Sequence, residues 1–280
     1  MVLRLAALII IAGFLRVNAQ PYALAEDYVP VLNTYDFFLV FGGSDGNTVK
    51  LKDGLIAEME FIALPGTSFK VHEVIEFEDR NLKYYRVTTE DYDYEGNFYV
   101  DSRMVKPLFD PPAKRRKFVP KKEDMIAELK RLEGYPYMWG GNCADGIEDM
   151  LKYYKSKGDI SAATKELWTL KGVDCSGLLY QVSNGCTPRN TSSLATFGKT
   201  VDIEGKTTEE IIAALRPLDL IVLKGHVIIV LDGNNVIESS PMTGVHRTET
   251  RVRLEKLLET LTPANEFSKT GKVFVARRWD

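Results

Sequence analysis

Cysteine and histidine are scarce in this chain, with three of each among 280 residues. Their spacing matches no zinc-binding pattern, so we expect no metal and no cofactor. The cysteines are Cys143, Cys175 and Cys186, and an odd number leaves one thiol unpaired in an oxidising compartment. Cys143 and Cys186 would then form a disulfide bridge or stay reduced and buried. His72 and His246 belong to no motif, and we expect them to be ordinary, partly exposed side chains.

An excess of positive charge is also missing. Lysine and arginine number 36 and aspartate and glutamate 39, which gives a net charge of −3 at pH 7. This balance argues against a nucleic-acid-binding protein, which is usually strongly basic. The content of 45% hydrophobic and 27% charged residues is ordinary for a globular protein, and the length allows two domains.

Long apolar runs are absent beyond the amino terminus. Residues 5–15 form an apolar stretch, which is too short for a membrane-spanning helix of about 20 residues. Arg4 before this stretch and the small-residue pattern at 17–19 after it are typical of a secretory signal peptide. We therefore expect residues 1–19 to be removed on export, with no membrane insertion afterwards. A buried amino-terminal helix or strand is the alternative.

The segment Asp174-Cys175-Ser176-Gly177 carries the strongest chemical signal. A strand-like segment, 170–173, leads into it, and apolar residues at helical spacing follow until Gly185. A cysteine in the first turn of a helix faces unpaired N–H groups and the positive end of the helix dipole, which favour the thiolate. His226, at the start of the apolar run 227–231, is the candidate base for this nucleophile.

Glu238 is the candidate third member of the site. It follows His226 across a turn-favouring segment, 232–235, so the two residues belong to one predicted hairpin. A three- or five-residue loop centred on Asp232 would place them directly opposite each other on one face, whereas a loop one residue longer or shorter would offset them. A carboxylate there would orient the imidazole. The alternative is a surface strand residue without a catalytic part.

Four further motifs surround this cysteine and this histidine. They are Tyr-Met-Trp-Gly-Gly at 137–141, Thr-Pro-Arg-Asn-Thr at 187–191, Arg-Pro-Leu-Asp-Leu at 216–220 and Val-Ile-Glu-Ser-Ser at 236–240. With these motifs, residues 123–280 resemble the NlpC-type cell-wall peptidases, papain-like cysteine enzymes that cut peptidoglycan stem peptides. The resemblance implies an α+β fold in which the helix that bears Cys175 packs on an antiparallel sheet. It also implies that Cys175, His226 and Glu238 are catalytic, although the family most often has a second histidine in the place of Glu238.

The resemblance further implies the substrate-binding residues. These are Tyr137, Asp174, Ser176 and Trp139, with Asp174 and Ser176 at the free amino end of a stem peptide. Residue chemistry alone offers other roles, because Asp174 would also cap a helix, Tyr137 would also suit the core, and Trp139 is expected to pack. We expect Arg189 to pair with an acid of the protein itself.

The resemblance implies a hydrolase that cuts between D-γ-glutamate and the diamino acid. The expected partners are stem peptides or muropeptides, and the expected place is the periplasm or cell envelope, where the protein would act as a monomer. Two other functions stay open: a thiol amidase or acyltransferase with another substrate, including that of a secreted effector, and a non-catalytic wall-binding protein.

Short strand patterns separated by turns predict a β-barrel or sandwich over 20–107, beginning with strands such as 37–41. The run 84–100 resembles bacterial SH3-like modules, which in the family restrict enzymes to stems with a free L-alanine amine; a generic β-domain is the alternative. Residues 108–122 form a proline-containing linker, whose basic run we interpret as a solvated connector. The insert at 142–173 shows helical spacing, so we expect it to be structured and to form one wall of the cleft.

Overall fold

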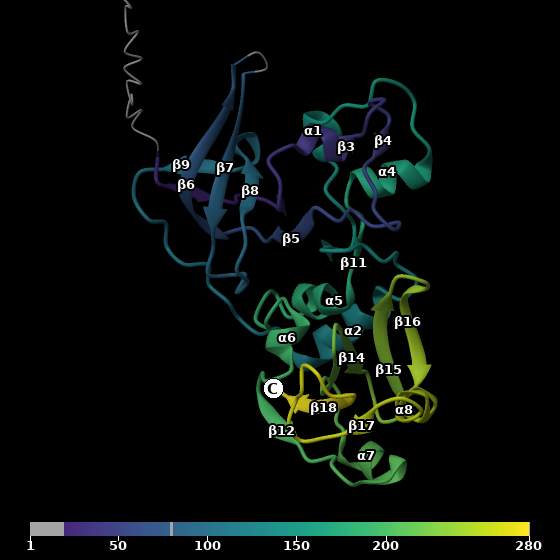
Figure 1. The fold of residues 1–280 in the computed structure, drawn as a ribbon. Coiled ribbons are helices and arrows are strands. Elements are labelled where there is room, and N and C mark those ends of the chain that lie inside the picture. Colours follow the sequence, from purple (N-terminus) through teal and green to yellow (C-terminus); the bar gives the residue numbers. More distant parts are fainter. Residues whose placement is uncertain (1–19, 79–80, 280) are drawn as a thin grey trace, which may run out of the picture.

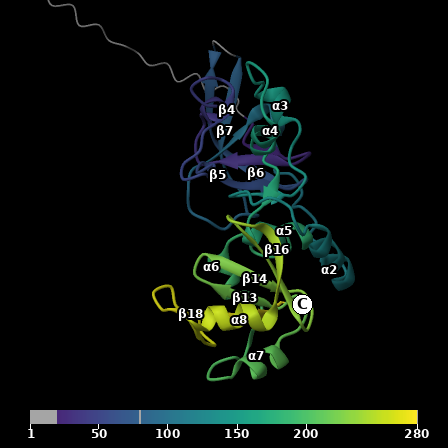
Figure 2. The same ribbon diagram turned by 90° about the vertical axis from the view of Figure 1, so that its right-hand side faces the viewer.

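The computed structural model describes residues 20–78 and 81–279, so the predicted signal peptide at 1–19 lies outside the described residues. Figure 1 shows two parts, one above the other: the upper part contains a first sheet, and the lower part contains a second sheet with helices around it. Figure 2 shows the same two parts after a turn of 90°, with helix α5 (Cys175–Val182) near their junction. Within the described ranges, every helix is too short or too polar to cross a membrane.

The first sheet has seven strands in the order β5-β2-β8-β7-β6-β1-β9, and each neighbouring pair is antiparallel. Both faces of this sheet carry core side chains: in the central strand Leu82–Thr88, Tyr84 packs in one core with Phe37, and Val87, on the opposite face, packs in another core with Phe61. The strands are β1 (Tyr22–Leu24), β2 (Val29–Leu32), β5 (Met59–Ala63), β6 (Ser68–Phe77), β7 (Leu82–Thr88), β8 (Phe98–Asp101) and β9 (Lys106–Leu108), and a 3-10 turn, η2 (Ser102–Met104), follows β8. The likeness of this region to an SH3-like module stays a prediction.

Residues 37–41 do not form the expected strand. They form helix α1 (Phe37–Val40) and then strand β3 (Phe41–Gly42), which pairs with β4 (Thr48–Val49). The helix forms because the Asp36 side chain accepts a hydrogen bond from the Leu39 N–H at 3.1 Å and so caps its first turn.

The insert is structured and packs on the upper part. Its elements are β10 (Asn142–Cys143), α3 (Met150–Tyr153), α4 (Ala162–Trp168) and β11 (Gly172–Val173). Trp168 and Tyr154 are fully buried in one core with Phe37, and the Tyr154 ring stacks on the Phe37 ring at 5.8 Å between centroids. The insert therefore belongs by its packing to the amino-terminal part, although it lies in the sequence of the second predicted domain.

The second sheet has the order β12-β18-β13-β14-β15-β16, all antiparallel, and β17 adds to β18 in parallel. Its strands are β12 (Lys199–Val201), β13 (Leu220–Leu223), β14 (His226–Val230), β15 (Asn235–Ser240), β16 (Gly244–Glu249), β17 (Thr262–Pro263) and β18 (Val273–Arg278). The helices of this part are α2 (Lys122–Arg131), α5, α6 (Thr191–Leu194), α7 (Thr208–Ala214) and α8 (Thr250–Leu258). The molecule is thus a mixed α/β protein with antiparallel sheets, as the sequence predicts at this coarse level.

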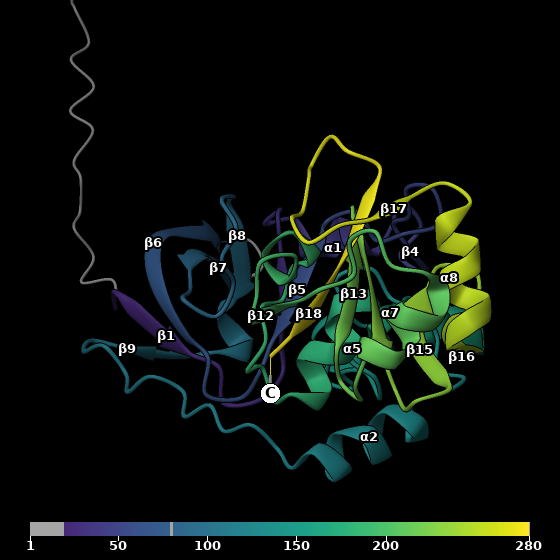
Figure 3. The ribbon, with the colours of Figure 1, turned by 90° about the horizontal axis from the view of Figure 1, so that it is seen from below.

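Helices cover both faces of the second sheet. Along β14, Val227 and Ile229 pack in a core with α2 and α5, whereas Ile228 and Val230 pack in a core with α7 and α8. The strand is therefore apolar on both faces, which explains its unbroken run of branched residues. In Figure 3, α2 lies at the bottom of the view and α8 at the right, on different sides of this sheet.

The basic linker is anchored to the protein. The Arg115 side chain is 7% exposed, and its guanidinium donates to the carboxylate of Asp91 at 3.2 Å and to the carbonyl of Asn184 at 3.0 Å. Lys117 also pairs with Asp91, at 2.7 Å. The interpretation of the basic run as a solvated connector is therefore wrong for Arg115, which joins the upper part to the loop after α5.

Candidate active site

Helix α5 begins at Cys175 because Asp174 caps it. The Asp174 backbone is extended, and its Oδ1 accepts a hydrogen bond from the Gly177 N–H at 2.7 Å. Glycine is required at 177, since a Cβ atom there would lie 1.9 Å from the Gly141 carbonyl oxygen. The first turn of α5 thus presses against the Gly-Gly segment before the insert, and this contact fixes the position of the cysteine.

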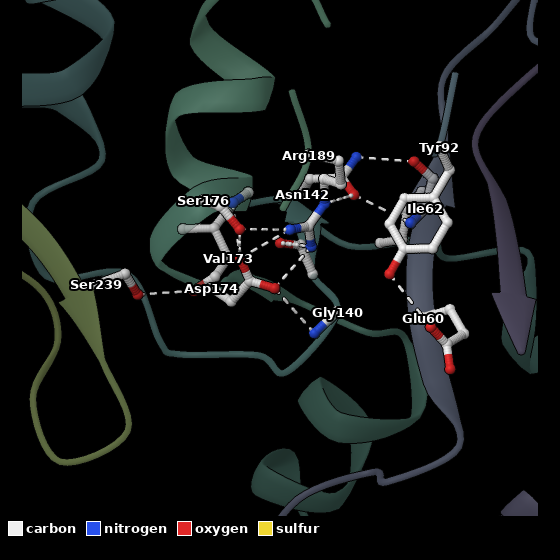
Figure 4. Close-up of polar contacts among 12 residues, drawn as sticks. Glu60, Ile62, Tyr92, Gly140, Asn142, Val173, Asp174, Ser176, Arg189 and Ser239 are labelled. Atoms are coloured by element: carbon white, nitrogen blue, oxygen red, sulfur yellow. Dashed lines mark hydrogen bonds and ion pairs between the residues drawn. The ribbon is translucent and has the colours of Figure 1, made fainter. Parts of the chain in front are cut away.

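The carboxylate of Asp174 is paired inside the protein. Arg189 donates to both of its oxygens, at 3.0 and 2.7 Å, and the Gly140 N–H adds a third bond at 3.1 Å. Ser176 Oγ accepts from Arg189 at 2.9 Å and lies 3.1 Å from Asp174 Oδ1 (Figure 4). The expected internal pairing of Arg189 is confirmed. Recognition of an ammonium group by Asp174 and Ser176 stays a prediction, and it would involve a carboxylate that already has a cationic partner.

Asn142 links this ion pair to the first sheet. Its Oδ1 accepts from Arg189 Nε at 3.1 Å and from the Ile62 N–H at 3.0 Å, and its Nδ2 donates to the Ile62 carbonyl at 2.8 Å (Figure 4). All its polar atoms are thus satisfied within a fully buried environment. The sequence offered no signal for this residue, because its partners, Ile62 and Arg189, come from two distant segments.

The Cys175 thiol is buried, with 7% of the residue exposed. Burial, and next the charge of Asp174, raise the pKa of the thiol to about 12, although the N–H groups of Val227 and Ser176 point at the sulfur and act in the opposite direction. The expectation that a helix start would favour the thiolate is therefore wrong for this environment. The thiol needs a base to become a nucleophile.

His226 and Glu238 lie together, with Nε2 and Oε2 2.5 Å apart. The hairpin between them pairs Ile229 with Ile237 and Val230 with Val236, which centres the turn on 233 and not on 232. Glu238 is therefore diagonal to His226 and not directly opposite, and the two long side chains bridge the offset on one face of the sheet. The contact agrees with the predicted hairpin, and its catalytic role stays a prediction.

Two more basic side chains lie near the same carboxylate. Arg253 of α8 donates to Glu238 from Nε at 2.5 Å and from Nη2 at 3.0 Å, and His246 Nε2 lies 3.8 Å from it. Burial acts to raise the pKa of Glu238, but the hydrogen bonds from His226 and Arg253 and the charge of Arg253 outweigh it and lower the pKa to about 2. Glu238 is thus ionised at neutral pH. His246, which we expected to belong to no site, therefore lies next to the carboxylate of Glu238.

The sulfur meets the second sheet beside the candidate base. The Val227 N–H points at Sγ, and Val227 directly follows His226. The Val227 side chain packs in the same core as Cys175, so the pleat of β14 turns the His226 ring toward the face that α8 covers. Across the described residues, no hydrogen bond joins this ring to the sulfur. The His226 ring and the Cys175 sulfur are thus directed to different faces of this sheet, and proton transfer between them stays a prediction.

A cavity of about 340 Å³ opens beside the sulfur; we call it the thiol cavity. The residues after position 122 that line it are Tyr137, Trp139, Gly140, Asp174, Cys175, Ser176, Arg189 and Gly225, among others. Trp139 is 46% exposed, so the expectation that it packs in the core is wrong and its ring is available to a ligand. Burial raises the pKa of Tyr137, and the nearby Asp174 and Cys175 raise it further, so the phenol keeps its proton at neutral pH.

The upper part closes the thiol cavity with residues that sequence reasoning missed. They include Glu60 of β5 and the nearby Tyr92 and Tyr94. Glu60 accepts from Asn33 Nδ2 at 3.0 Å and from the Tyr92 hydroxyl at 3.2 Å, both neutral donors. Figure 4 shows the Glu60 and Tyr92 pair facing the Asp174 and Arg189 network. The cavity is therefore built by both parts of the molecule.

The remaining thiols form no bridge. Cys143 is buried and its Sγ lies 3.4 Å from the Gly146 carbonyl, and Cys186 is a partly exposed free cysteine. The predicted Cys143–Cys186 disulfide is therefore wrong; both thiols are reduced, and Cys143 is buried as the alternative expects, whereas Cys186 is partly exposed. In the part of the chain that the structure describes, no group of three or more His, Cys, Asp and Glu side chains could hold a metal ion.

No family model and no curated protein matches this chain. Among solved structures, an NlpC/P60 family protein from Bacillus cereus is similar to it at 16% sequence identity, with a TM-score of 0.35. The match covers 94% of this chain and 64% of that one, so the chain spans less than two thirds of the length of this structural neighbour. A likeness at this level is too weak to carry an argument, and the function must be argued from the site.

Proposed function

We propose that this protein is a cysteine hydrolase that cleaves an amide bond in peptidoglycan stem peptides, with Cys175 as nucleophile, His226 as base and Glu238 as the group that orients the imidazole. One arrangement supports the proposal: Cys175 begins helix α5, lines a cavity and packs in one core with Val227, which directly follows His226, whose Nε2 lies 2.5 Å from Glu238 Oε2. A buried thiol, an imidazole and an ionised carboxylate are the parts of a thiol acyl-transfer site.

Catalysis then proceeds through an acyl-enzyme. His226 Nδ1 takes the proton of the Cys175 thiol as the sulfur attacks the carbonyl carbon, and the same proton passes to the leaving amine when the C–N bond breaks. A water, deprotonated by His226, next attacks the thioester and releases the acid and the thiol. This step requires the His226 ring, which the pleat of β14 directs toward the face that α8 covers, to reach the sulfur when substrate binds.

The acyl part of the substrate would occupy the thiol cavity. Arg189 neutralises Asp174, whereas the hydrogen-bond partners of Glu60 are neutral groups. Glu60 is therefore the carboxylate in this cavity whose charge is left to bind a cationic group of the substrate. An ammonium group near a partly buried carboxylate forms a charge-assisted hydrogen bond. We therefore assign the free L-alanine amine of a stem peptide to the region between Glu60 and Asp174, and the bond cut to that between D-γ-glutamate and the diamino acid. An exported protein in the periplasm or cell envelope would meet this substrate.

Mass spectrometry of defined substrates tests this proposal. The panel is the tripeptide L-Ala-γ-D-Glu-diamino acid, its N-acetylated form, and p-nitrophenyl acetate as a simple ester. We expect cleavage of the free tripeptide after D-glutamate and little cleavage of the acetylated form. Turnover of the ester without either peptide would instead indicate another thiol acyl-transfer reaction. Wall binding without any turnover would indicate a non-catalytic protein.

A further inference from the structure

The buried side chain of Asn142 touches both parts of the molecule and has no place in the proposed chemistry so far. Asn142 is the first residue of β10 and directly follows the Gly-Gly segment at 140–141. Ile62 belongs to β5, the end strand of the first sheet. Its N–H donates to the Asn142 Oδ1 at 3.0 Å, and its carbonyl accepts from Nδ2 at 2.8 Å. These two bonds to one residue of a strand fix the plane of the amide.

The amide of Asn142 in turn fixes the guanidinium of Arg189, whose Nε donates to Oδ1 at 3.1 Å. Arg189 donates from Nη1 and Nη2 to the two oxygens of Asp174, at 3.0 and 2.7 Å. The same two nitrogens also donate to Ser176 Oγ at 2.9 Å and to the Gly141 carbonyl at 3.2 Å (Figure 4). All five N–H donors of the guanidinium thus have a partner. Because the group is planar, the bond at Nε determines where the other four donors point.

The two charges of this ion pair act on Cys175 in opposite directions. Burial raises the pKa of the Cys175 thiol most, the charge of Asp174 raises it further, and the charge of Arg189 lowers it. The attraction between two charges weakens as they separate. A guanidinium that turns away from Asp174 would therefore compensate its charge less well, and the thiol would become harder to ionise.

We infer that Asn142 is a positioning residue of the proposed active site, through which the first sheet orients Arg189 against Asp174 and so keeps Cys175 able to react. Its part in catalysis rests on the proposed function, whereas its effect on the thiol is measurable without a substrate. Ile62 lies two positions after Glu60 on β5, and Glu60 lines the thiol cavity. The strand that forms a wall of this cavity thus also orients the charges beside the nucleophile.

A purely structural role for Asn142 would give a different result. Loss of its amide leaves the main-chain groups of Ile62 and the Nε of Arg189 without these partners, which lowers stability in either case. If the amide only held the packing together, its loss would leave the sulfur of Cys175 equally or more accessible to a reagent. A positioning role predicts a less reactive sulfur, because the thiolate is the form that reacts.

The test measures the rate at which iodoacetamide alkylates Cys175 at pH 7.5, with the partly exposed Cys186 as internal reference. Asn142→Leu removes the amide and is close to it in size. Arg189→Lys keeps the positive charge and removes the planar fork. The double variant combines the two changes. Asn142→Ser carries the same prediction as Asn142→Leu and leaves room for a water to pair the freed groups, so it serves if circular dichroism shows that Asn142→Leu is unfolded.

Asn265→Leu is the matched control. The Asn265 amide also joins distant segments, since its Oδ1 accepts from the Ile203 N–H at 2.9 Å and its Nδ2 donates to Asp202 Oδ1 at 2.7 Å. It does not line the thiol cavity. Loss of this amide should lower stability and leave the labelling of Cys175 unchanged.

We expect Asn142→Leu and Arg189→Lys each to slow the labelling of Cys175 about tenfold, the effect of about one pH unit in the ionisation of the thiol. The double variant should be no slower than the slower single variant, because both changes act through one guanidinium. An unchanged or faster rate in Asn142→Leu overturns the inference, and so does an unchanged rate in Arg189→Lys. A double variant that is slowed about hundredfold also overturns it, because the two effects would then be independent.

Hydrolysis separates this inference from the proposed function. If the unmodified protein cleaves the tripeptide L-Ala-γ-D-Glu-diamino acid, Asn142→Leu should lower kcat about tenfold with little change in KM. A higher KM with an unchanged kcat would place Asn142 in substrate binding and overturn the inference. If the unmodified protein cleaves no substrate, the proposed function fails, and the labelling rates still decide whether Asn142 positions the charges beside Cys175.

Discussion

Arg253 Nε lies 2.5 Å from Glu238 Oε1, so this contact joins helix α8 to strand β15, which carries Glu238. The other oxygen of the same carboxylate meets His226 Nε2 at 2.5 Å. The arginine, the carboxylate and the imidazole thus form one chain of contacts on the α8 face of the sheet. A carboxylate held in this way has one rotamer and keeps its charge, both of which suit a group that orients a catalytic histidine.

We predict that Arg253→Gln lowers kcat by about tenfold with little change in KM, because Glu238 loses the charge that keeps it ionised. Without Arg253, burial raises the pKa of Glu238 above its value of about 2, and the acid limb of the pH–rate profile moves to higher pH. Steady-state rates measured across the pH range check this shift. Arg251→Gln, on the same helix and paired with the exposed Glu209, is the control and should leave the profile unchanged.

The same pKa shift predicts a pH dependence of stability. Glu238 titrates at about 2 in the folded state against an ordinary value of 4.5, so the unfolded state binds the proton more readily. Its contribution to stability is present above pH 4.5 and is lost as the pH falls toward about 2. Urea unfolding of the unmodified protein and of Glu238→Gln should therefore differ at pH 7, and the difference should narrow on acidification. A constant difference would contradict the assigned charge state.

Alkylation rates test the coupling between the thiol and the imidazole. Because burial and Asp174 raise the pKa of Cys175 to about 12, the thiol needs its proposed base, His226, to react near neutral pH. In the unmodified protein, iodoacetamide should label Cys175 at pH 7.5. In His226→Phe it should be at least tenfold slower at pH 7.5. The partly exposed Cys186 serves as the internal control in both proteins. Equal labelling rates for Cys175 would show that His226 does not act on this thiol.

Arg189 and Asp174 form the buried ion pair beneath the nucleophile, with side chains 3% and 11% exposed. We predict that Arg189→Met lowers the free energy of unfolding by about 3–5 kcal/mol, because it leaves a buried carboxylate unpaired. Arg131→Met breaks the exposed pair with Glu128 and should cost at most about 1 kcal/mol. Urea unfolding measures both changes. The double variant Arg189→Met/Asp174→Asn should regain part of the loss, and no recovery would count against this assignment.

Glu60 is predicted to set the preference for a free amino end. Glu60→Gln removes the charge and keeps the shape, so KM for the free tripeptide should rise about tenfold while the rate on the N-acetylated form stays the same. Glu58→Gln is the control, since Glu58 pairs with Lys50 at 2.5 Å and does not line the thiol cavity. An unchanged ratio between the two substrates would remove Glu60 from amine recognition.

Local patterns were sufficient to predict several parts of this structure. The helix start at Cys175 follows from the residue type at Asp174, whose side chain caps the first turn. The contact between His226 and Glu238 follows from strand alternation around a recognisable turn, although the pairing register is shifted by two residues. These predictions needed only neighbours in the chain.

Features that depend on tertiary packing could not be predicted in this way. The thiol pKa is set by burial beneath both parts of the molecule, which outweighs the helix-start effect. Glu60 and Arg253 reach the site from a strand of the first sheet and from a helix beyond the second, so no local pattern marks them. The segment at Phe37 becomes a helix because a cap at Asp36 and the packing of the insert override its strand-like composition.

The most direct test of the site is the hydrolysis of L-Ala-γ-D-Glu-meso-diaminopimelate by the unmodified protein and by Cys175→Ala, followed by mass spectrometry, with circular dichroism to show that both are folded. The account predicts that the unmodified protein releases L-Ala-D-Glu and free diaminopimelate, and that Cys175→Ala releases neither. Release of both products by Cys175→Ala at the unmodified rate would contradict it.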